Sequence, residues 1–194
     1  TSLDSEVGAH LGRINTNAEV LLRLISDMLD VSKIESGREE WQITPVDMRE
    51  IVSDTVAAMS QIFQERSITV TVDAPAFVPA VLADVDRLIQ VMLNLLSNAA
   101  KFSPPGGEVW IHAKCMNKRV FILVQDFGDG IPENFRDKVF EKFAQANPSS
   151  NRQYAGSGLG LSISKLLLEA MGGSIRFESQ MGKGTTFVVD LPEA

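Results

Sequence analysis

Several residue types that mark particular protein classes are scarce in this sequence. Its 194 residues include one cysteine and two histidines, which excludes a disulfide framework and disfavours a zinc or iron site. Acidic residues outnumber basic ones by 25 to 18, giving a formal net charge of −7, whereas nucleic-acid binders usually carry a basic stripe. No apolar run approaches the roughly 18 residues of a membrane span. We therefore expect neither a zinc or iron site, nor a nucleic-acid partner, nor a membrane-spanning segment.

The composition that remains is that of an ordinary folded domain. Hydrophobic residues make up 44% and charged residues 22% of the chain, and a chain of this length buries roughly 70% of its unfolded surface. No signal peptide is visible, and the first residue is Thr1 rather than Met, so we expect a piece of a longer protein. The acidic balance suits a cytoplasmic domain, whose full-length protein could be membrane-anchored.

Residues 8–37 predict one long helix. Apolar residues alternate at spacings of three and four, which is the heptad seam of a coiled coil rather than the broader face of a globular helix. The seam consists of Leu11, Ile14, Ala18, Leu21, Ile25 and Met28. Gly37 supplies a C-cap. A seam needs a partner helix, and no other segment carries a matching seam. We therefore expect residues 1–39 to be a unit separate from residues 40–194; a helix packed on its own domain is the alternative.

Residues 41–194 mix β-rich and helical segments. The predicted strands are Trp41–Val46, Ile68–Val72, Glu108–Met116, Arg119–Asp126, Ser174–Ser179 and Gly184–Leu191. The predicted helices are Asp47–Arg66, Asp84–Phe102 and Leu159–Met171. Helices on one face of a mostly antiparallel sheet make an α+β two-layer sandwich. The strand Arg119–Asp126 is apolar on both faces, so we expect both to be buried.

Local signals refine this expectation. Asp47 and Asp84 are suited to cap their helices, and Asn117-Lys118 is suited to a tight hairpin. Cys115 should be a small buried residue on its strand. The long stretch between Asp126 and Gly160 is rich in Gly, Pro, Asn and Ser, and such connections are usually functional.

The helix Asp84–Phe102 carries a polar stripe among apolar neighbours. Asn94, Asn98 and Lys101 stand at i, i+4 and i+7, which places them on one helix face. An amide oxygen suits Mg²⁺, which keeps several waters and shares phosphate ligands, and an ammonium pairs with phosphate. A set of surface residues on an amphipathic helix explains the stripe equally well.

Two further motifs suit a flat ligand and a phosphate. The sequence Asp126-Phe-Gly128-Asp-Gly130-Ile131 ends a strand: a buried carboxylate needs donors, such as the amine of adenine, and the glycines permit close approach. The sequence Gly156-Ser-Gly158-Leu159-Gly160-Leu161 leads into a helix, whose free N–H groups suit phosphate. Alone, the first could be a β-turn and the second a flexible linker.

The order of these motifs resembles the ATP-binding domain of sensor histidine kinases, of the GHKL (Bergerat) type. The N, G1, F, G2 and G3 boxes of that family resemble Asn94–Phe102, Asp126–Gly130, Phe140–Phe143, Gly156–Gly160 and Gly182–Thr185. The seam helix resembles the second helix of the family's dimerisation and phospho-acceptor hairpin. The resemblance covers residues 41–194 in order, and five boxes are far more specific than one.

The resemblance implies a role for each position. Asn98 would coordinate Mg²⁺, with Asn94 assisting at the phosphates, Lys101 contacting phosphate and Asp126 binding the adenine amine. Phe140 and Phe143 would anchor a lid that runs to about Gly156. The remaining nucleotide-binding residues would be Phe102, Gly128, Gly130, Ile131, Phe143, Gly156, Gly158, Leu159, Gly160, Leu161 and Thr185.

The resemblance also implies a kinase that depends on ATP and Mg²⁺ and relays phosphate to a response regulator. Related ATPases carry a glutamate as base where this chain has Asn94, which cannot take a proton, so we expect poor ATP hydrolysis. His10 and His112 lack the acceptor motif, so the acceptor helix would belong to another part of the protein or to its dimer mate. The alternatives are a GHKL ATPase, a serine-directed kinase, or a non-catalytic nucleotide-sensing module.

Overall fold

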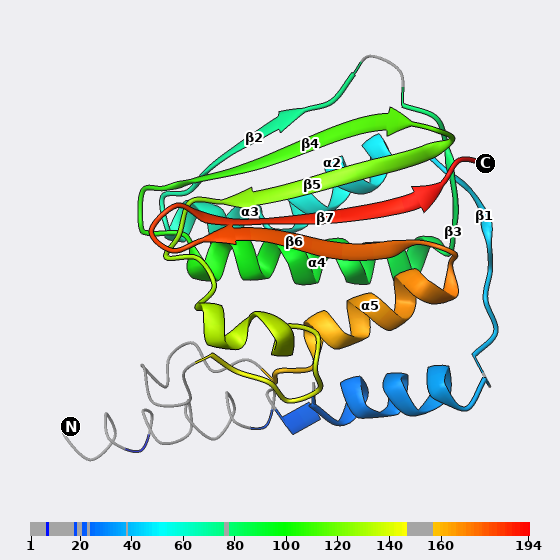
Figure 1. Cartoon of the computed structure of the whole chain (residues 1–194), viewed down its shortest axis with the longest axis horizontal. Coiled ribbons are helices and arrows are strands. Elements are labelled where there is room, and N and C mark those ends of the chain that lie inside the picture. The colour runs from blue at the N-terminus through cyan, green and yellow to red at the C-terminus, as the bar shows by residue number, and fades with distance from the viewer. Residues whose placement is uncertain are drawn as a thin grey trace. The chain divides into compact units, whose positions relative to one another are not determined.

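The computed structural model describes residues 7, 18, 21–22, 24–37, 39–75, 78–146 and 157–194 (Figure 1). The chain divides into two compact units, Thr1–Glu39 and Glu40–Ala194. Within the described residues, no helix has both the length and the apolar character needed to cross a membrane.

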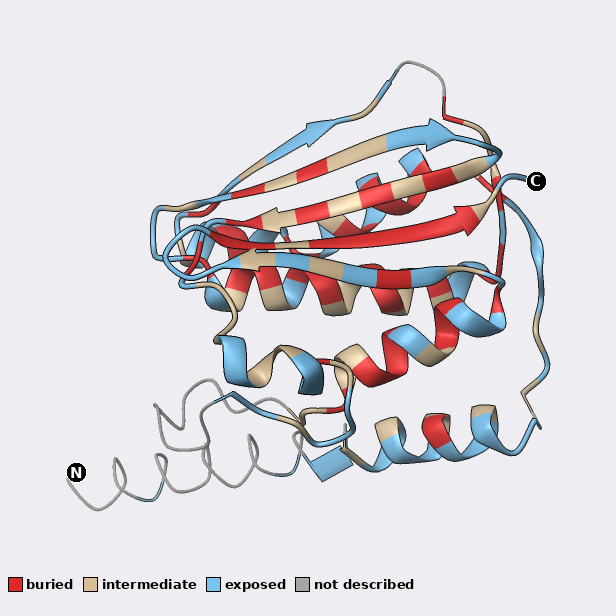
Figure 2. Cartoon of the chain, in the orientation of Figure 1, coloured by how far each residue is buried: buried red, intermediate tan, exposed pale blue. Residues whose placement is uncertain are grey.

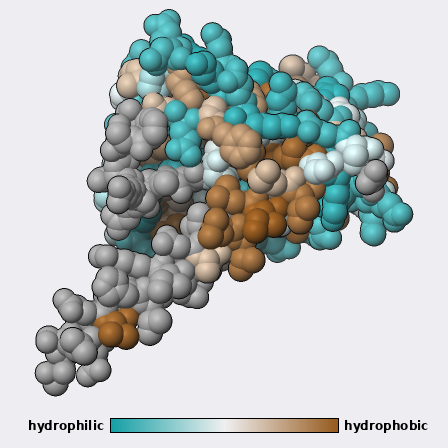
Figure 3. All heavy atoms as spheres, turned by 90° about the horizontal axis from the view of Figure 1, so that it is seen from below, coloured by the Kyte–Doolittle hydropathy of each residue, from teal (hydrophilic) through white to brown (hydrophobic). Residues whose placement is uncertain are grey.

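The N-terminal unit is helical over residues 24–35. Gly37 adopts a φ of 65°, and its N–H donates to the Ile34 carbonyl at 3.0 Å, which confirms the predicted C-cap. Leu21, Ile25 and Met28 of the predicted seam are 58%, 55% and 55% exposed, and the apolar side chains of this helix contribute to the brown surface in Figure 3. Leu11 and Ile14, at the N-terminal end of the seam, lie outside the described residues.

The C-terminal unit is built on a five-stranded sheet with the strand order β2-β4-β5-β7-β6. Its strands are β2 Thr69–Asp73, β4 Glu108–Met116, β5 Arg119–Asp126, β6 Ser174–Gln180 and β7 Gly184–Pro192. Only the pair β2 and β4 is parallel, which confirms a mostly antiparallel sheet. A small second sheet pairs β1 (Thr44–Val46) with β3 (Val81–Ala83). The sequence did not predict β3.

The helices of this unit begin close to where the sequence predicts. They are α2 Met48–Ala58, α3 Ser60–Glu65, α4 Val85–Phe102 and α5 Gly160–Ala170, with a 3₁₀ helix at Glu133–Lys138. The Asp47 and Asp84 carboxylates accept from backbone N–H groups of the first turn, at 2.8 and 3.3 Å, which confirms both N-caps.

One predicted helix is interrupted. Residues 47–66 form α2 and α3 rather than a single helix, with the break at Met59. Met59 and Phe63 are both buried, at 6% and 4% exposed. The apolar pattern therefore continues across the break and gives no sign of it.

The helices lie on one face of the sheet, so the predicted two-layer sandwich is confirmed (Figure 1). Along β5, every second residue is buried: Val120, Ile122 and Val124 are each 1% exposed (Figure 2). Phe121 and Leu123, on the other face, are only half-buried. The expectation that both faces of this strand are buried is therefore wrong, because the helices cover one face only.

Cys115 is a second correction. The thiol is on an exposed residue, and the last three residues of β4, Lys114–Met116, are all exposed. The neighbouring strand β2 pairs with β4 only as far as His112, so the last residues of β4 form an open edge of the sheet and an apolar residue there is not buried. The hairpin that follows is confirmed: Asn117 and Lys118 have φ of 54° and 58°, as a tight type I′ turn requires.

Candidate nucleotide-binding site

Four predicted site residues lie in the C-terminal half of α4. Asn94, Asn98 and Lys101 are half-buried, and Phe102 is 58% exposed. The opposite side of the helix is fixed in the core by fully buried side chains such as Leu95 and Leu96. The helix that carries the polar stripe is therefore fixed by its buried side, while the side chains of the stripe remain accessible to a ligand. No described residue hydrogen-bonds to the Asn98 side chain.

Asn94 connects α4 to the start of α5. Its Nδ2 donates to Ser164 Oγ at 2.9 Å, and Ser164 is 1% exposed. A Cβ at Gly160 would overlap the Asn94 side-chain oxygen. The amide is therefore enclosed between the first turns of α5 and its own helix, and glycine at position 160 permits this approach.

Lys101 lies beside the aromatic ring that follows it. Its ammonium nitrogen is 4.9 Å from the centroid of the Phe102 ring, within the range of a cation–π contact. Burial lowers the pKa of Lys101. A phosphate at this position would offset that desolvation by pairing with the ammonium.

Asp126 ends β5 as a buried carboxylate that is only 5% exposed. Its Oδ1 accepts from the N–H of Gly128 at 2.9 Å and from the N–H of Thr185 at 3.3 Å. Burial raises the pKa of Asp126, and these backbone hydrogen bonds partly oppose the shift. Oδ2 has no hydrogen-bond partner among the described residues, so one acceptor atom remains for a ligand.

The loop after Asp126 is fixed against the turn between β6 and β7. Gly130 has a φ of 79°, and a Cβ there would meet the Gln180 carbonyl oxygen at 2.5 Å, so the position requires glycine. The Ile131 N–H donates to Ser179 Oγ at 2.8 Å. The Gly182 N–H donates to the Asp129 carbonyl at 2.8 Å.

The glycine-rich segment leads into the N-terminus of α5. The Gly158 carbonyl accepts from the Phe143 N–H at 2.9 Å, and the Leu159 N–H donates to Ser157 Oγ at 3.1 Å. Leu159 is 1% exposed and holds the turn in place. Within the described residues, no side chain caps α5. The N–H groups of its first turn, from Gly160 and Leu161 onward, are therefore suited to an anion.

The structure brings most of the predicted residues into two clusters. At one, Asp126, Gly128 and Thr185 are hydrogen-bonded together, and Gly128 lies against the Phe102 carbonyl. At the other, Asn94 lies against Gly160 and Phe143 bonds to Gly158. The helix rise places Asn94 about 12 Å from Phe102 along α4, with Asn98 and Lys101 between the clusters. Gly156 lies outside the described residues.

Sequence reasoning missed three serines that support these clusters. They are Ser157, Ser164 and Ser179, which bond to Leu159, Asn94 and Ile131 respectively. The contact of Ser179 depends on its pairing with Thr185 across β6 and β7. The pairing register of β6 cannot be predicted from its sequence, because this seven-residue strand lacks a strongly alternating apolar pattern.

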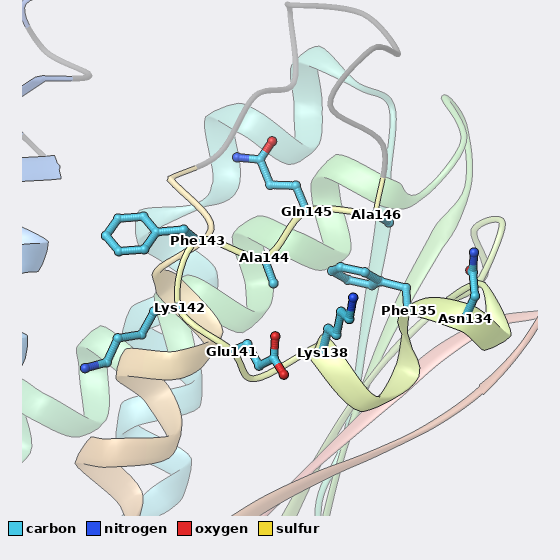
Figure 4. Close-up of a pocket in the computed structure, with 9 residues that line it drawn as sticks. All are labelled: Asn134, Phe135, Lys138, Glu141, Lys142, Phe143, Ala144, Gln145 and Ala146. Carbon is cyan, nitrogen blue, oxygen red and sulfur yellow. The ribbon is translucent and has the colours of Figure 1, made fainter.

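A hollow of about 420 Å³ lies along the 3₁₀ helix and the segment that follows it, and Phe143 of the second cluster is part of its lining (Figure 4). Lys138 and Glu141 lie near Phe135 and Ala144, whereas Phe143 points away from them. None of Asn98, Lys101, Asp126 and Thr185 lines it. We therefore place the candidate site at the two clusters rather than in this hollow.

The fold and the site together define an ATP-binding domain of the GHKL class. The fold is a two-layer sandwich, and the site combines a buried aspartate at one strand end, an asparagine-bearing helix and a helix N-terminus without a side-chain cap. A family model described as "Histidine kinase-, DNA gyrase B-, and HSP90-like ATPase" matches residues 83–194. The chain belongs to this family, and within it to the sensor histidine kinases, as its relatives show.

The sequence is similar to those of named histidine kinases. The chain is 38% identical over 186 residues to the circadian input-output histidine kinase CikA of Synechococcus elongatus, covering 95% of this chain and 25% of CikA. It is 36% identical over 183 residues to the signal transduction histidine-protein kinase BarA of Escherichia coli, covering 92% of this chain and 20% of BarA. The chain thus spans about a quarter or less of the length of these relatives.

Solved structures agree with these relatives. The structure of full-length ShkA in complex with AMPPNP superposes with a TM-score of 0.83 at 30% identity, covering 96% of this chain and 38% of ShkA. A mycobacterial sensor histidine kinase, MprB, superposes with a TM-score of 0.65 at 31% identity, covering 78% of this chain and 97% of that structure. The chain therefore has the fold and the family membership of a histidine-kinase ATP-binding domain.

Proposed function

We propose that this module binds ATP with its adenine at Asp126 and its phosphates along α4 and the start of α5. This proposal rests on how the two oxygens of the Asp126 carboxylate are used. Oδ1 accepts from two backbone N–H groups, while Oδ2 is left to accept from a ligand. An exocyclic amine is the matching donor. Phe102, Gly128, Gly130, Ile131 and Thr185 surround this end.

The phosphate end would be formed by backbone N–H groups and one cation. Gly158, Leu159, Gly160 and Leu161 lie at the uncapped start of α5, where the N–H groups and the helix dipole favour negative charge. Lys101 would pair with phosphate as a point charge. Phe143, bonded through its N–H to Gly158, would hold the adjoining lid.

Mg²⁺ fits Asn98, and we propose that residue as its protein ligand. The described residues contain no group of three or more His, Cys, Asp or Glu that could hold a metal, so an all-protein cage is not what this site offers. Mg²⁺ commonly takes few protein ligands and completes its shell with water and phosphate. The metal would neutralise phosphate charge during transfer. The unbonded Asn98 amide oxygen can supply one ligand.

We further propose that the γ-phosphoryl group goes to a histidine rather than to water. Asn94 has no carboxylate to accept a proton from water, and its amide is already bonded to Ser164. His112 lies in β4 opposite Leu123, on the sheet face away from Asp126, with its Nδ1 3.2 Å from an Asp73 oxygen. His10 lies outside the described residues. The acceptor would lie on a helix that these residues do not include.

The N-terminal helix would be the second helix of the acceptor hairpin. Its exposed seam of Leu21, Ile25 and Met28 would pack against the first helix and against a second copy in a homodimer, as a coiled-coil seam requires. The phosphate would then pass to the receiver domain of a response regulator in the cytoplasm. Residues 1–39 and 40–194 would thus be a hairpin helix and a catalytic domain.

Binding and hydrolysis assays test the nucleotide part of this proposal. A non-hydrolysable ATP analogue should bind more tightly with Mg²⁺, and Asn98→Ala should remove that dependence. The matched control is Ser97→Ala on the exposed adjacent position of α4, which should keep it. Asn98→Ala with unchanged Mg²⁺ dependence would reject the ligand assignment, and rapid release of free phosphate by the unaltered chain would favour an ATPase.

A further inference from the structure

Ser179 ties together three elements at the adenine end. Its Oγ accepts from the Ile131 N–H at 2.8 Å, and its carbonyl accepts from Arg136 Nη2 at 2.7 Å. Ile131 follows the glycine loop, and Arg136 belongs to the 3₁₀ helix. One serine on the edge strand β6 therefore holds both segments that follow Asp126.

The same hydroxyl determines how Thr185 hydrogen-bonds. Ser179 Oγ lies 3.1 Å from the Gly184 carbonyl and 2.9 Å from Thr185 Oγ1. A serine hydroxyl has one hydrogen and two lone pairs. Either hydroxyl could donate in the Ser179–Thr185 pair taken alone. If Ser179 donated to Thr185, its contact with the Gly184 carbonyl would contain no hydrogen, so the one arrangement that makes all three contacts hydrogen bonds gives the Ser179 hydrogen to Gly184. One lone pair takes the Ile131 N–H, and the other takes the Thr185 hydroxyl hydrogen.

Thr185 is therefore left with lone pairs only. Its N–H is bonded to Asp126 Oδ1, and its hydroxyl hydrogen is bonded to Ser179. The groups that this end can turn toward a ligand are then two acceptors, Asp126 Oδ2 and Thr185 Oγ1. The amine of adenine has two hydrogens and can satisfy both acceptors. A 6-oxo purine has a carbonyl in that place and a single N1–H beside it, so at least one of the two acceptors is left unpaired.

We propose that Ser179 is a positioning residue for base selection, which commits the Thr185 hydrogen and so makes the site selective for adenine over a 6-oxo purine. This inference rests on the proposed adenine site at Asp126. Ser179 itself touches no nucleotide. Without its hydroxyl, Thr185 could rotate and donate a hydrogen bond, and a 6-oxo base would be better tolerated.

The test compares the Kd of non-hydrolysable analogues of ATP and ITP on the full chain. Ser179→Ala should reduce the preference for the ATP analogue about tenfold, the scale of one hydrogen bond, mostly by tightening ITP. Ser179→Thr keeps a hydroxyl and suits a strand, so it should restore the preference. The matched control is Ser174→Ala, whose hydroxyl bonds to Asp190 at the other end of β6.

The outcomes distinguish a failure of this inference from a failure of the proposed adenine site at Asp126. Equal loss of affinity for both analogues in Ser179→Ala, or unchanged preference, would show a purely structural serine and overturn the inference while the adenine site stands. If Ser179→Ala does not fold, Ser179→Thr and Ser179→Cys are compared instead, and a thiol that keeps the full preference also overturns it. If the unaltered chain binds both analogues equally, the adenine site and this inference both fail.

Discussion

Replacing Asp126 by asparagine should change which purine the site prefers. In the native site, Oδ1 accepts from two backbone N–H groups, of Gly128 and Thr185. The asparagine oxygen must take this place, since Nδ2 there would oppose two donors. Nδ2 then occupies the position of the free carboxylate oxygen. The variant therefore presents a donor where the native residue presents an acceptor.

The size of the effect follows from the hydrogen bonds exchanged. A hydrogen bond to a charged group is worth about 1.5–3 kcal/mol, so the affinity for ATP should fall roughly 10- to 150-fold. ITP carries an oxygen in place of the amine and gains a neutral hydrogen bond of about 1 kcal/mol. The ratio of the two affinities should therefore move by roughly 100-fold or more in favour of ITP.

Calorimetric titration of the two non-hydrolysable analogues, with unaltered chain and variant, measures this ratio. A thermal melt of each protein separates loss of binding from loss of fold. Burial raises the pKa of Asp126, so a neutral asparagine should be tolerated by the fold. If the variant folds and keeps the native preference for ATP, Asp126 does not contact the base edge and the reasoning is refuted.

Four further predictions concern the same site. Because burial raises the pKa of Asp126, ATP affinity should fall as the pH drops through that raised pKa, with proton release on binding in that window; Asp126→Asn should lack this dependence. The same shift means that the carboxyl's contribution to folding stability is present below its unfolded pKa and is lost as the pH rises through the folded value, which urea melts across the acid range would measure. Gly160→Ala should cost about 1–3 kcal/mol of unfolding free energy through overlap with Asn94, and the double variant with Asn94→Ala should recover part of it; an additive loss would contradict the contact. Lys101→Met should weaken triphosphate binding about tenfold or more while leaving adenosine binding unchanged, and equal losses for both would place Lys101 outside the phosphate end.

The fold was predictable where the apolar pattern was long. The strands β4 and β5 begin and end at the predicted residues, since both are long and bounded by clear turns. The short strand β3, Val81–Ala83, gave no signal because three residues show no period. The break at Met59 was hidden because buried side chains continue through it.

The candidate site was predictable to the extent that glycines and single polar residues mark it. Asp126 was recognisable from its place at the end of a β-rich run, and its burial and backbone donors match that expectation. Ser164 and Ser179 were not recognisable, because their roles come from helix–helix contact and strand register. Such contacts join residues 70 and 48 positions apart in the chain.

The central claim, transfer of phosphate from ATP to a histidine, is tested most directly by supplying an acceptor. The chain would be mixed with labelled ATP, Mg²⁺ and a separate acceptor hairpin from a related histidine kinase, and the hairpin would be examined for phosphate that is labile in acid and stable in base. The account predicts such a label with the unaltered chain and none with Asn98→Ala. Unlabelled hairpin, together with rapid release of free phosphate, would contradict it.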